Sequence, residues 1–171
     1  MKNLFLRLLV VTLMAMPFTS FAQECLDYHK QKCQSKEQKN PDGTVNVDGY
    51  VYSPDSRSAL MTKGQKSEFK FTIHQGRDYR LSICAAEILG DKIQFQLMDF
   101  EEGTILYDNA GASFSREFEF TVKETRNIKI VVTVPNDKAA ANNAFALKAK
   151  NSETGCVGVL IETMVAPKTG F

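Results

Sequence analysis

The chain has 171 residues, with 21 Lys and Arg against 20 Asp and Glu. Its length suits one domain rather than two. The balanced charge disfavours a nucleic-acid-binding protein, which normally carries a basic excess. A content of 43% apolar and 24% charged residues also disfavours a globally disordered chain.

The first 22 residues predict a secretory signal peptide. Lys2 and Arg7 give a positive start, residues 8–16 are almost all apolar, and small residues at 20 and 22 suit cleavage after Ala22. We therefore expect an exported protein, periplasmic or extracellular, with no transmembrane segment in the mature chain. Because residues 1–22 contain no acidic residue, their removal changes the formal net charge from +1 to −1.

The next segment, residues 23–43, is predicted to be a short helix followed by a turn. Residues 24–39 contain no Gly or Pro and are rich in polar residues that helices tolerate. Pro41-Asp42-Gly43 is a turn signal that ends the helical segment.

Residues 44–171 are predicted to form a single antiparallel β-sandwich with a jelly-roll-like topology. Apolar and polar residues alternate along several runs, which places one side of each strand on a core and the other in water. Short turn signals between the runs favour antiparallel pairing. A long loop, or alternatively a short helix, is expected at 136–154. The clearest strands are expected at 68–74, 79–83, 92–97, 117–122 and 127–134, and weaker ones at 45–52, 57–62, 103–108 and 156–164.

The four cysteines, Cys25, Cys33, Cys84 and Cys156, are expected to form two disulfides, because an even count in an exported chain favours them. In one arrangement each N-terminal cysteine bonds to one strand cysteine on the outer face of the sandwich, and Gly158 leaves room for the helix. In the other, Cys25 pairs with Cys33 and Cys84 with Cys156. A continuous helix would place Cys25 and Cys33 about 12 Å apart, beyond the reach of about 7 Å that a disulfide allows. This distance favours the first arrangement.

No catalytic, cofactor-binding or metal-binding residue is predicted, and we expect the protein not to be an enzyme. The sequence has two histidines, His29 and His74, and lacks the common local catalytic motifs. Cys25, His29 and Cys33 have the spacing of metal ligands on one helix face, but an oxidising compartment converts such thiols to disulfides. An enzyme would need a pocket that brings His29 or His74 within hydrogen-bond distance of a nucleophile.

Two kinds of ligand remain as alternatives. Oxygen ligands for Ca²⁺ occur near one predicted hairpin, although a solvated turn explains them more simply. Tyr50, Tyr52 and Tyr107 could contribute to a sugar-binding surface, whereas most Phe residues fall on the predicted core side. The possible calcium ligands are Asp99, Glu101, Glu102 and Asp108, and the predicted core phenylalanines are Phe69, Phe71, Phe95, Phe118 and Phe120.

The strand sequences at 64–71, 76–83, 93–99 and 106–109 resemble the jelly-roll modules of the pre-peptidase C-terminal type, which accompany secreted bacterial peptidases. The segments 78–84 and 155–162 are similar to small exported bacterial proteins of unassigned function. The resemblance implies a sandwich fold and an envelope or secreted location, and it implies no catalytic residue. We therefore expect a non-catalytic binding or structural module that acts through a protein or cell-envelope partner. A carbohydrate- or calcium-binding module is the alternative, and an enzyme is a weaker one.

Overall fold

The computed structural model describes residues 25–33, 49–136 and 153–166. The predicted signal peptide and its cleavage site, most of the loop expected at 136–154, and residues 34–48 lie outside the described residues. The described part is mainly β, with one short α-helix, α2 (Tyr28–Lys32), and two 3-10 turns, η3 (Glu87–Leu89) and η4 (Asn109–Ala112). Within that part, no helix is long and apolar enough to cross a membrane.

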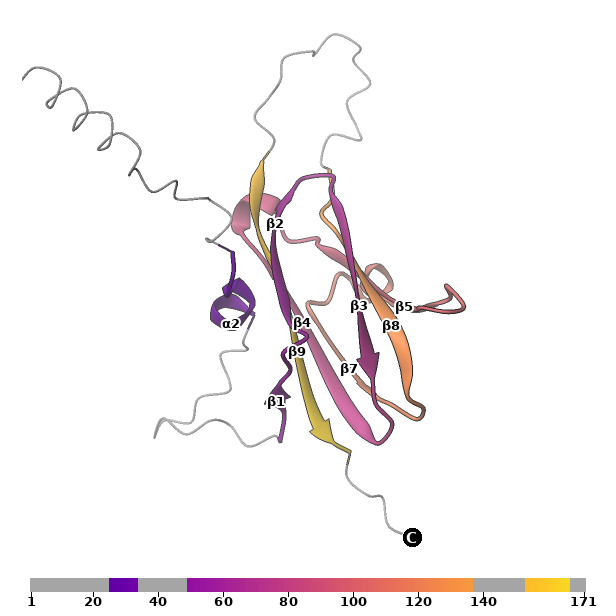
Figure 1. Ribbon diagram of the computed structural model, residues 1–171. Coiled ribbons are helices and arrows are strands. Elements are labelled where there is room, and N and C mark those ends of the chain that lie inside the picture. Colours follow the sequence, from indigo (N-terminus) through magenta and orange to yellow (C-terminus); the bar gives the residue numbers. More distant parts are fainter. Residues whose placement is uncertain (1–24, 34–48, 137–152, 167–171) are drawn as a thin grey trace, which may run out of the picture.

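Two antiparallel sheets pack face to face (Figure 1). The first sheet has five strands in the order β1-β9-β4-β7, and β2 also pairs with β9. The second has four strands in the order β3-β8-β5-β6. The strands are β1 (Val51–Tyr52), β2 (Arg57–Thr62), β3 (Lys66–Ile73), β4 (Arg77–Ala85), β5 (Gln94–Asp99), β6 (Ile105–Asp108), β7 (Glu117–Thr121), β8 (Arg126–Thr133) and β9 (Thr154–Val165).

The strands pair in a nested order, β2 with β9, β3 with β8, β4 with β7 and β5 with β6. Further pairing of β4 with β9 and of β5 with β8 joins these hairpin-like pairs into the two sheets. One long antiparallel ribbon folded over on itself in this way is a jelly roll, an arrangement of eight strands in two sheets. The predicted fold class is therefore confirmed, with β1 as an extra short strand beside β9.

The core lies between the sheets and follows the predicted alternation. In β4 the inward side chains Tyr79, Leu81 and Ile83 are buried, and Phe71 and Phe95 come from the second sheet. Phe69, Phe118 and Phe120 pack against this core while remaining partly exposed. β5 buries alternate residues, as period-two patterning requires, whereas β4 and β9 are buried on both faces along their middles, and β1 is exposed.

The N-terminal helix is shorter than predicted within the described residues. The prediction was a helix over 24–39, whereas α2 covers only Tyr28–Lys32 and the chain at Cys25 to Asp27 forms a turn. A helix of so few residues is not stable alone in water. Its stability must therefore come from the contacts that hold it against the sheet.

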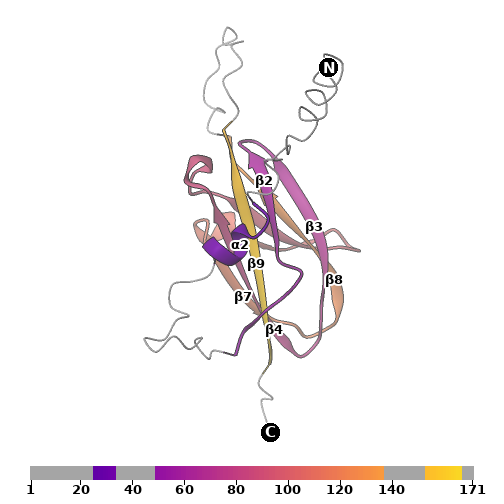
Figure 2. The ribbon, with the colours of Figure 1, turned by 60° about the vertical axis from the view of Figure 1, so that its left-hand side comes forward.

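Two disulfides fix α2 on the outer face of the five-stranded sheet, where it crosses β9 (Figure 2). Cys25 bonds to Cys156 in β9, and Cys33 bonds to Cys84 in β4. These links follow the first of the two predicted arrangements, in which the helix is tethered across the sandwich.

Gly158 allows the backbone of α2 to approach the sheet. A Cβ atom at this position would lie 2.8 Å from the Cα of His29, 2.8 Å from the Sγ of Cys33 and 3.0 Å from the Sγ of Cys84. Real Cβ atoms do not make contacts this short with backbone. The missing side chain therefore leaves the room that the sequence predicted for the helix.

Candidate functional site

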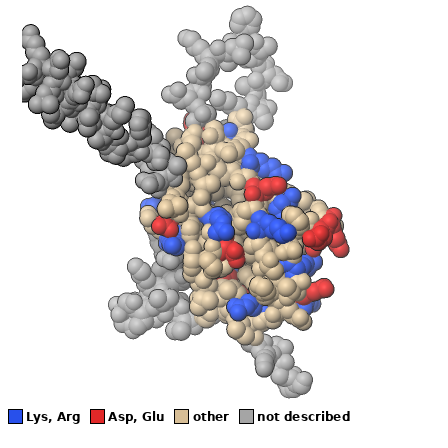
Figure 3. All heavy atoms as spheres, in the orientation of Figure 1, with Lys and Arg blue, Asp and Glu red and all other residues tan. Residues whose placement is uncertain are grey.

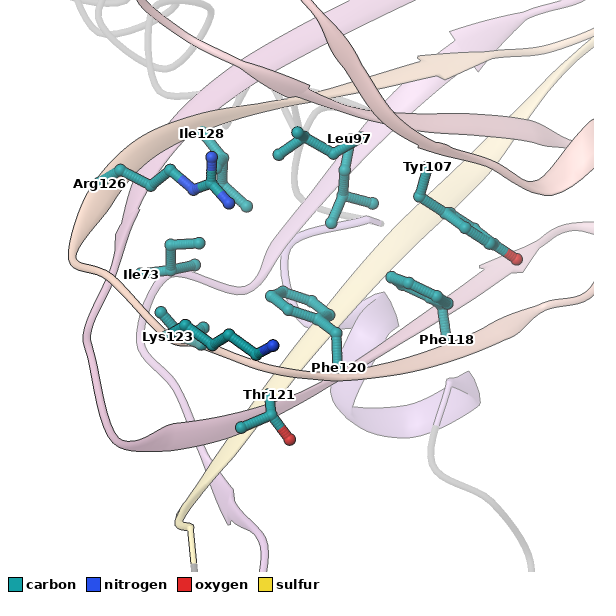
Figure 4. Close-up of a pocket in the computed structure, with 11 residues that line it drawn as sticks. Ile73, Leu97, Tyr107, Phe118, Phe120, Thr121, Lys123, Arg126 and Ile128 are labelled. Atoms are coloured by element: carbon teal, nitrogen blue, oxygen red, sulfur yellow. The ribbon is translucent and has the colours of Figure 1, made fainter.

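The sandwich has an opening between two edge strands. β6 ends the four-stranded sheet and β7 ends the five-stranded sheet, and no other described strand pairs with their outer edges. A cavity of about 300 Å³ enters the space between the sheets here (Figure 4). We call this cavity the edge groove. It is lined by Ile73, Leu97, Leu106, Tyr107, Phe118, Phe120, Thr121, Val122, Lys123, Arg126 and Ile128.

Stacked aromatic rings form one wall of the edge groove. The ring centroids of Tyr107 and Phe118 are 3.6 Å apart, and those of Phe118 and Phe120 are 5.5 Å apart. Phe95 and Tyr79 extend this row into the core, at 5.4 Å from Tyr107 and 5.6 Å from Phe120. Burial raises the pKa of Tyr107, so its hydroxyl stays neutral and the wall carries no charge.

Asn109 shapes the chain that connects β6 to β7 and so positions this wall. Its side chain is 1% exposed. Its Oδ1 accepts from the N–H of Phe95, and its Nδ2 donates to the carbonyls of Ile93 and Ser115. A short side-chain amide can satisfy backbone groups in this way where the chain leaves a sheet. The turn therefore holds Tyr107 and Phe118, which flank it, in a fixed relation.

Two cations lie at the other end of the edge groove. Figure 4 shows Lys123 and Arg126 extending toward the cavity from the end opposite Tyr107 and Phe118, with Phe120 between the two ends. Arg126 donates from Nη1 to Oδ2 of Asp99 at 3.4 Å. Lys123 has no ion-pair partner among the residues described. The groove is therefore apolar at one end and positively charged at the other.

The four possible calcium ligands do not converge. Asp99 Oδ1 accepts from the backbone N–H groups of Glu101 and Glu102. The hydrogen bond from Glu102 is the main reason that the pKa of Asp99 is lowered, while partial burial opposes it and Glu101 and Arg126 add to it. Among the described residues, no group of three or more His, Cys, Asp or Glu side chains could hold a metal ion. Asp99 thus closes the β5–β6 turn.

Asp108, the fourth of these residues, is also used locally. Desolvation tends to raise its pKa, but hydrogen bonds from the Ala110 N–H and from the side chains of Gln94 and Gln96 lower it overall. The carboxylate caps η4 and joins β5 to β6. Its oxygens are therefore already engaged by protein donors.

The three tyrosines considered for sugar binding lie in separate environments. Tyr50 stacks on the guanidinium of Arg80, with 4.3 Å between the ring centroid and Cζ. Tyr52 stacks on His29, whereas Tyr107 lies in the edge groove. A polar hollow of about 440 Å³ occurs elsewhere, and Tyr79 is the one tyrosine in its lining. It is lined by Ser53, Asp55, Thr72, His74, Arg77, Tyr79 and Thr163.

The two histidines have different surroundings. His74 is exposed at the end of β3. His29 is 4% exposed, with its Nδ1 2.6 Å from Ser58 Oγ and its Nε2 3.2 Å from the Tyr52 hydroxyl. Ser58 Oγ also accepts from the backbone N–H of His29 at 2.9 Å. These distances allow neutral His29 to accept the Ser58 hydroxyl proton at Nδ1 and to donate Nε2–H to the Tyr52 hydroxyl.

This histidine–serine contact joins α2 to β2 rather than opening onto a cavity. The small hollow beside Ser58 has a volume of about 40 Å³, and His29 is not among its lining residues. The metal set Cys25, His29 and Cys33 is also not formed, because both thiols are bound in disulfides.

We predict that the stability of the protein falls when the pH is lowered below about 6.5. Desolvation lowers the pKa of His29, Lys30 and Arg57 add to the effect, and Asp27 opposes it. The unfolded chain therefore takes up a proton more readily than the folded one. The stabilisation from neutral His29 is complete above the ordinary pKa of about 6.5 and is lost as the pH falls toward the lower folded value.

Urea unfolding at several pH values between 7.5 and 5.5 measures this effect. In H29Q the free energy of unfolding should change less over this range than in the unaltered protein. H74Q, which removes the exposed histidine, should keep the original pH dependence. An equal flattening in both variants would contradict the assignment to His29.

Sequence reasoning did not find Lys123, Arg126 and Leu106 as members of one site. They come from the β7–β8 turn, the start of β8 and β6, and none carries a local motif. The one residue of this site that the sequence singled out was Tyr107. It was considered as part of a ligand-binding surface, whereas the phenylalanines were predicted to lie in the core. The buried pair Arg80 and Glu162, 2.8 Å apart on the outer face of the five-stranded sheet, was also missed.

No protein-family model matches the chain, and no curated protein matches it. Among solved structures, the chain is similar to the crystal structure of Aeromonas hydrophila PliG, a periplasmic lysozyme inhibitor of g-type lysozyme. The TM-score is 0.44 and the identity 8%, over 70% of this chain and 90% of that chain. Because both the TM-score and the sequence identity are low, this similarity supports no statement about the function of the chain. The resemblance to pre-peptidase C-terminal modules stays a prediction.

Proposed function

We propose that the chain is an exported, non-catalytic binding module that takes an apolar group of a protein or cell-envelope partner into the edge groove. The observation that carries the proposal is the groove itself, a cavity of about 300 Å³ lined by aromatic and aliphatic side chains at an open edge of the sandwich. Small-ligand sites begin at about this volume and have mainly apolar linings with a few polar groups.

The surroundings of the groove support binding rather than simple surface irregularity. Leu106, which lines the groove from β6, is 42% exposed. Large apolar side chains at the mouth of a cavity are typical of sites where another molecule binds. The stacked rings and the Asn109 turn keep the wall in place without a ligand, which reduces the entropy lost on binding.

Other observations fit an exported module without a catalytic role. Two disulfides suit an oxidising compartment. The lining of the edge groove contains no histidine, cysteine or carboxylate that could act as a nucleophile or general base. On the face in Figure 3, Lys and Arg are interspersed with Asp and Glu, which disfavours a polyanion as the partner of that face.

A neutral apolar dye, N-phenyl-1-naphthylamine, tests the proposal, because its fluorescence rises when it enters an apolar site. We expect saturable binding of one dye molecule per chain to the oxidised, processed protein. L106S should weaken this binding about five-fold, since it removes part of the apolar lining.

L60S is the matched control. Leu60 is 45% exposed, lies on the edge strand β2 and is absent from the groove lining. The L60S substitution should therefore leave dye binding unchanged. The proposal fails if the dye does not saturate, or if L60S and L106S weaken binding equally.

A further inference from the structure

We infer that the edge groove binds a single-chain anionic amphiphile, with the acyl chain along Phe118 and Phe120 and the carboxylate or phosphate head at Lys123 and Arg126. This inference rests on the proposed function and names the class of molecule that occupies the groove. It follows from the unequal chemistry of the two ends of one cavity.

The apolar part of the groove fits one hydrocarbon chain. Phe118 and Phe120 from β7 form one wall, Leu97 and Ile128 from the other sheet form the opposite wall, and the Tyr107 ring stacks on Phe118 at one end (Figure 4). Apart from the Tyr107 hydroxyl, these side chains offer no hydrogen-bond donor or acceptor, so a sugar would lose its water without replacement by them. A methylene chain loses nothing of this kind and gains from burial. A volume of about 300 Å³ favours one chain over the two chains of a membrane diacyl lipid.

The charged end fits an anionic head. The Lys123 ammonium and the Arg126 guanidinium both border the cavity. Guanidinium groups bind carboxylate and phosphate through paired N–H donors, and ammonium groups bind them as point charges. Two cations at one end of an otherwise apolar cavity therefore complement a molecule that is anionic at one end only.

The local acid does not cancel this charge. Asp99 is the acidic side chain paired with Arg126, through one contact of 3.4 Å from Nη1. Its other oxygen accepts from the N–H groups of Glu101 and Glu102. Asp99 thus holds the guanidinium at the groove while leaving other N–H donors of Arg126 for a ligand. Lys123 adds a charge that has no partner among the described residues.

Displacement of the bound dye tests the inference. Dodecanoate, dodecyl phosphate and dodecanol are compared below their micelle concentrations, since they share a chain and differ in the head. We expect dodecanoate or dodecyl phosphate to displace the dye at lower concentration than dodecanol, and the tighter of the two identifies the head. K123Q should weaken binding of the anionic compounds about two- to five-fold and leave dodecanol unchanged.

K129Q is the matched control for charge. Lys129 follows Ile128 on β8, pairs with Glu68 at 3.4 Å and does not line the groove. The K129Q substitution should leave the displacement of the dye by all three compounds unchanged. The inference is overturned if dodecanol competes as well as the anions, or if K129Q acts like K123Q. In either case dye binding would still support the proposed function. If the dye does not bind at all, both the proposed function and this inference fail.

Discussion

Replacing Cys33 and Cys84 together by alanine is expected to lower the free energy of unfolding by about 2–5 kcal/mol. The disulfide links residues 51 positions apart, and its loss restores conformational freedom to the unfolded chain. It also releases the C-terminal end of α2, a five-residue helix that needs a tether to persist. Urea unfolding of the oxidised proteins at pH 7.5 measures the loss.

The double variant C25A/C156A serves as the comparison. Its disulfide spans 131 positions, so chain entropy alone predicts a somewhat larger loss. Dye binding by both folded variants should stay as in the unaltered protein, because the helix lies on an outer face and the groove lies between the sheets at β7. A loss below about 1 kcal/mol for C33A/C84A would show that the tether contributes little.

Replacing Gly158 by alanine is expected to lower the free energy of unfolding by about 1–3 kcal/mol. The added methyl group would meet the backbone of His29 and both sulfurs of the Cys33–Cys84 disulfide at 3.0 Å or less. Neither a helix backbone nor a cross-link can rotate away as a flexible side chain can. The helix must therefore move off β9 or the strand must shift.

Thermal and urea unfolding compare this variant with G111A. A Cβ at Gly111 would have no atom within 4 Å, and its backbone is not in the left-handed region. G111A should therefore have nearly unchanged stability. If G158A proves as stable as G111A, the close approach of α2 to β9 would be contradicted. Combining G158A with C33A/C84A should cost less than the sum of the two, because a released helix no longer meets the methyl group.

The strands were predictable because the same apolar alternation that identifies a strand also buries it. β2, at Arg57–Thr62, begins and ends where the sequence predicted, and the other strands differ mainly at their ends. The space for the helix at Gly158 was also predictable, because the alternation along β9 places Gly158 on the same outer face as Cys156. These features depend on spacing within one segment, which a sequence displays directly.

The edge groove was not predictable in the same way. Its cations and its aromatic rings come from strands of both sheets and from the turn that joins β7 to β8, and they meet through the nested pairing of the strands. The burial of His29 was missed for a related reason. Its partners Ser58 and Tyr52 are 29 and 23 positions away, and they meet His29 where the two disulfides hold α2 on the sheet.

The position of β9 has a consequence for the order in which the protein can assemble. β9 is the last strand of the jelly roll, yet it lies inside the five-stranded sheet, between β4 on one side and β1 and β2 on the other. A chain that emerges from its N-terminus can therefore close β3 on β8 and β5 on β8 before this sheet exists. Until residue 156 arrives, Cys25 has no native partner, and Cys33 lies nearby in the sequence. The five-stranded sheet can therefore be completed only after β9 has been made. The native disulfide of Cys25 can also form only then.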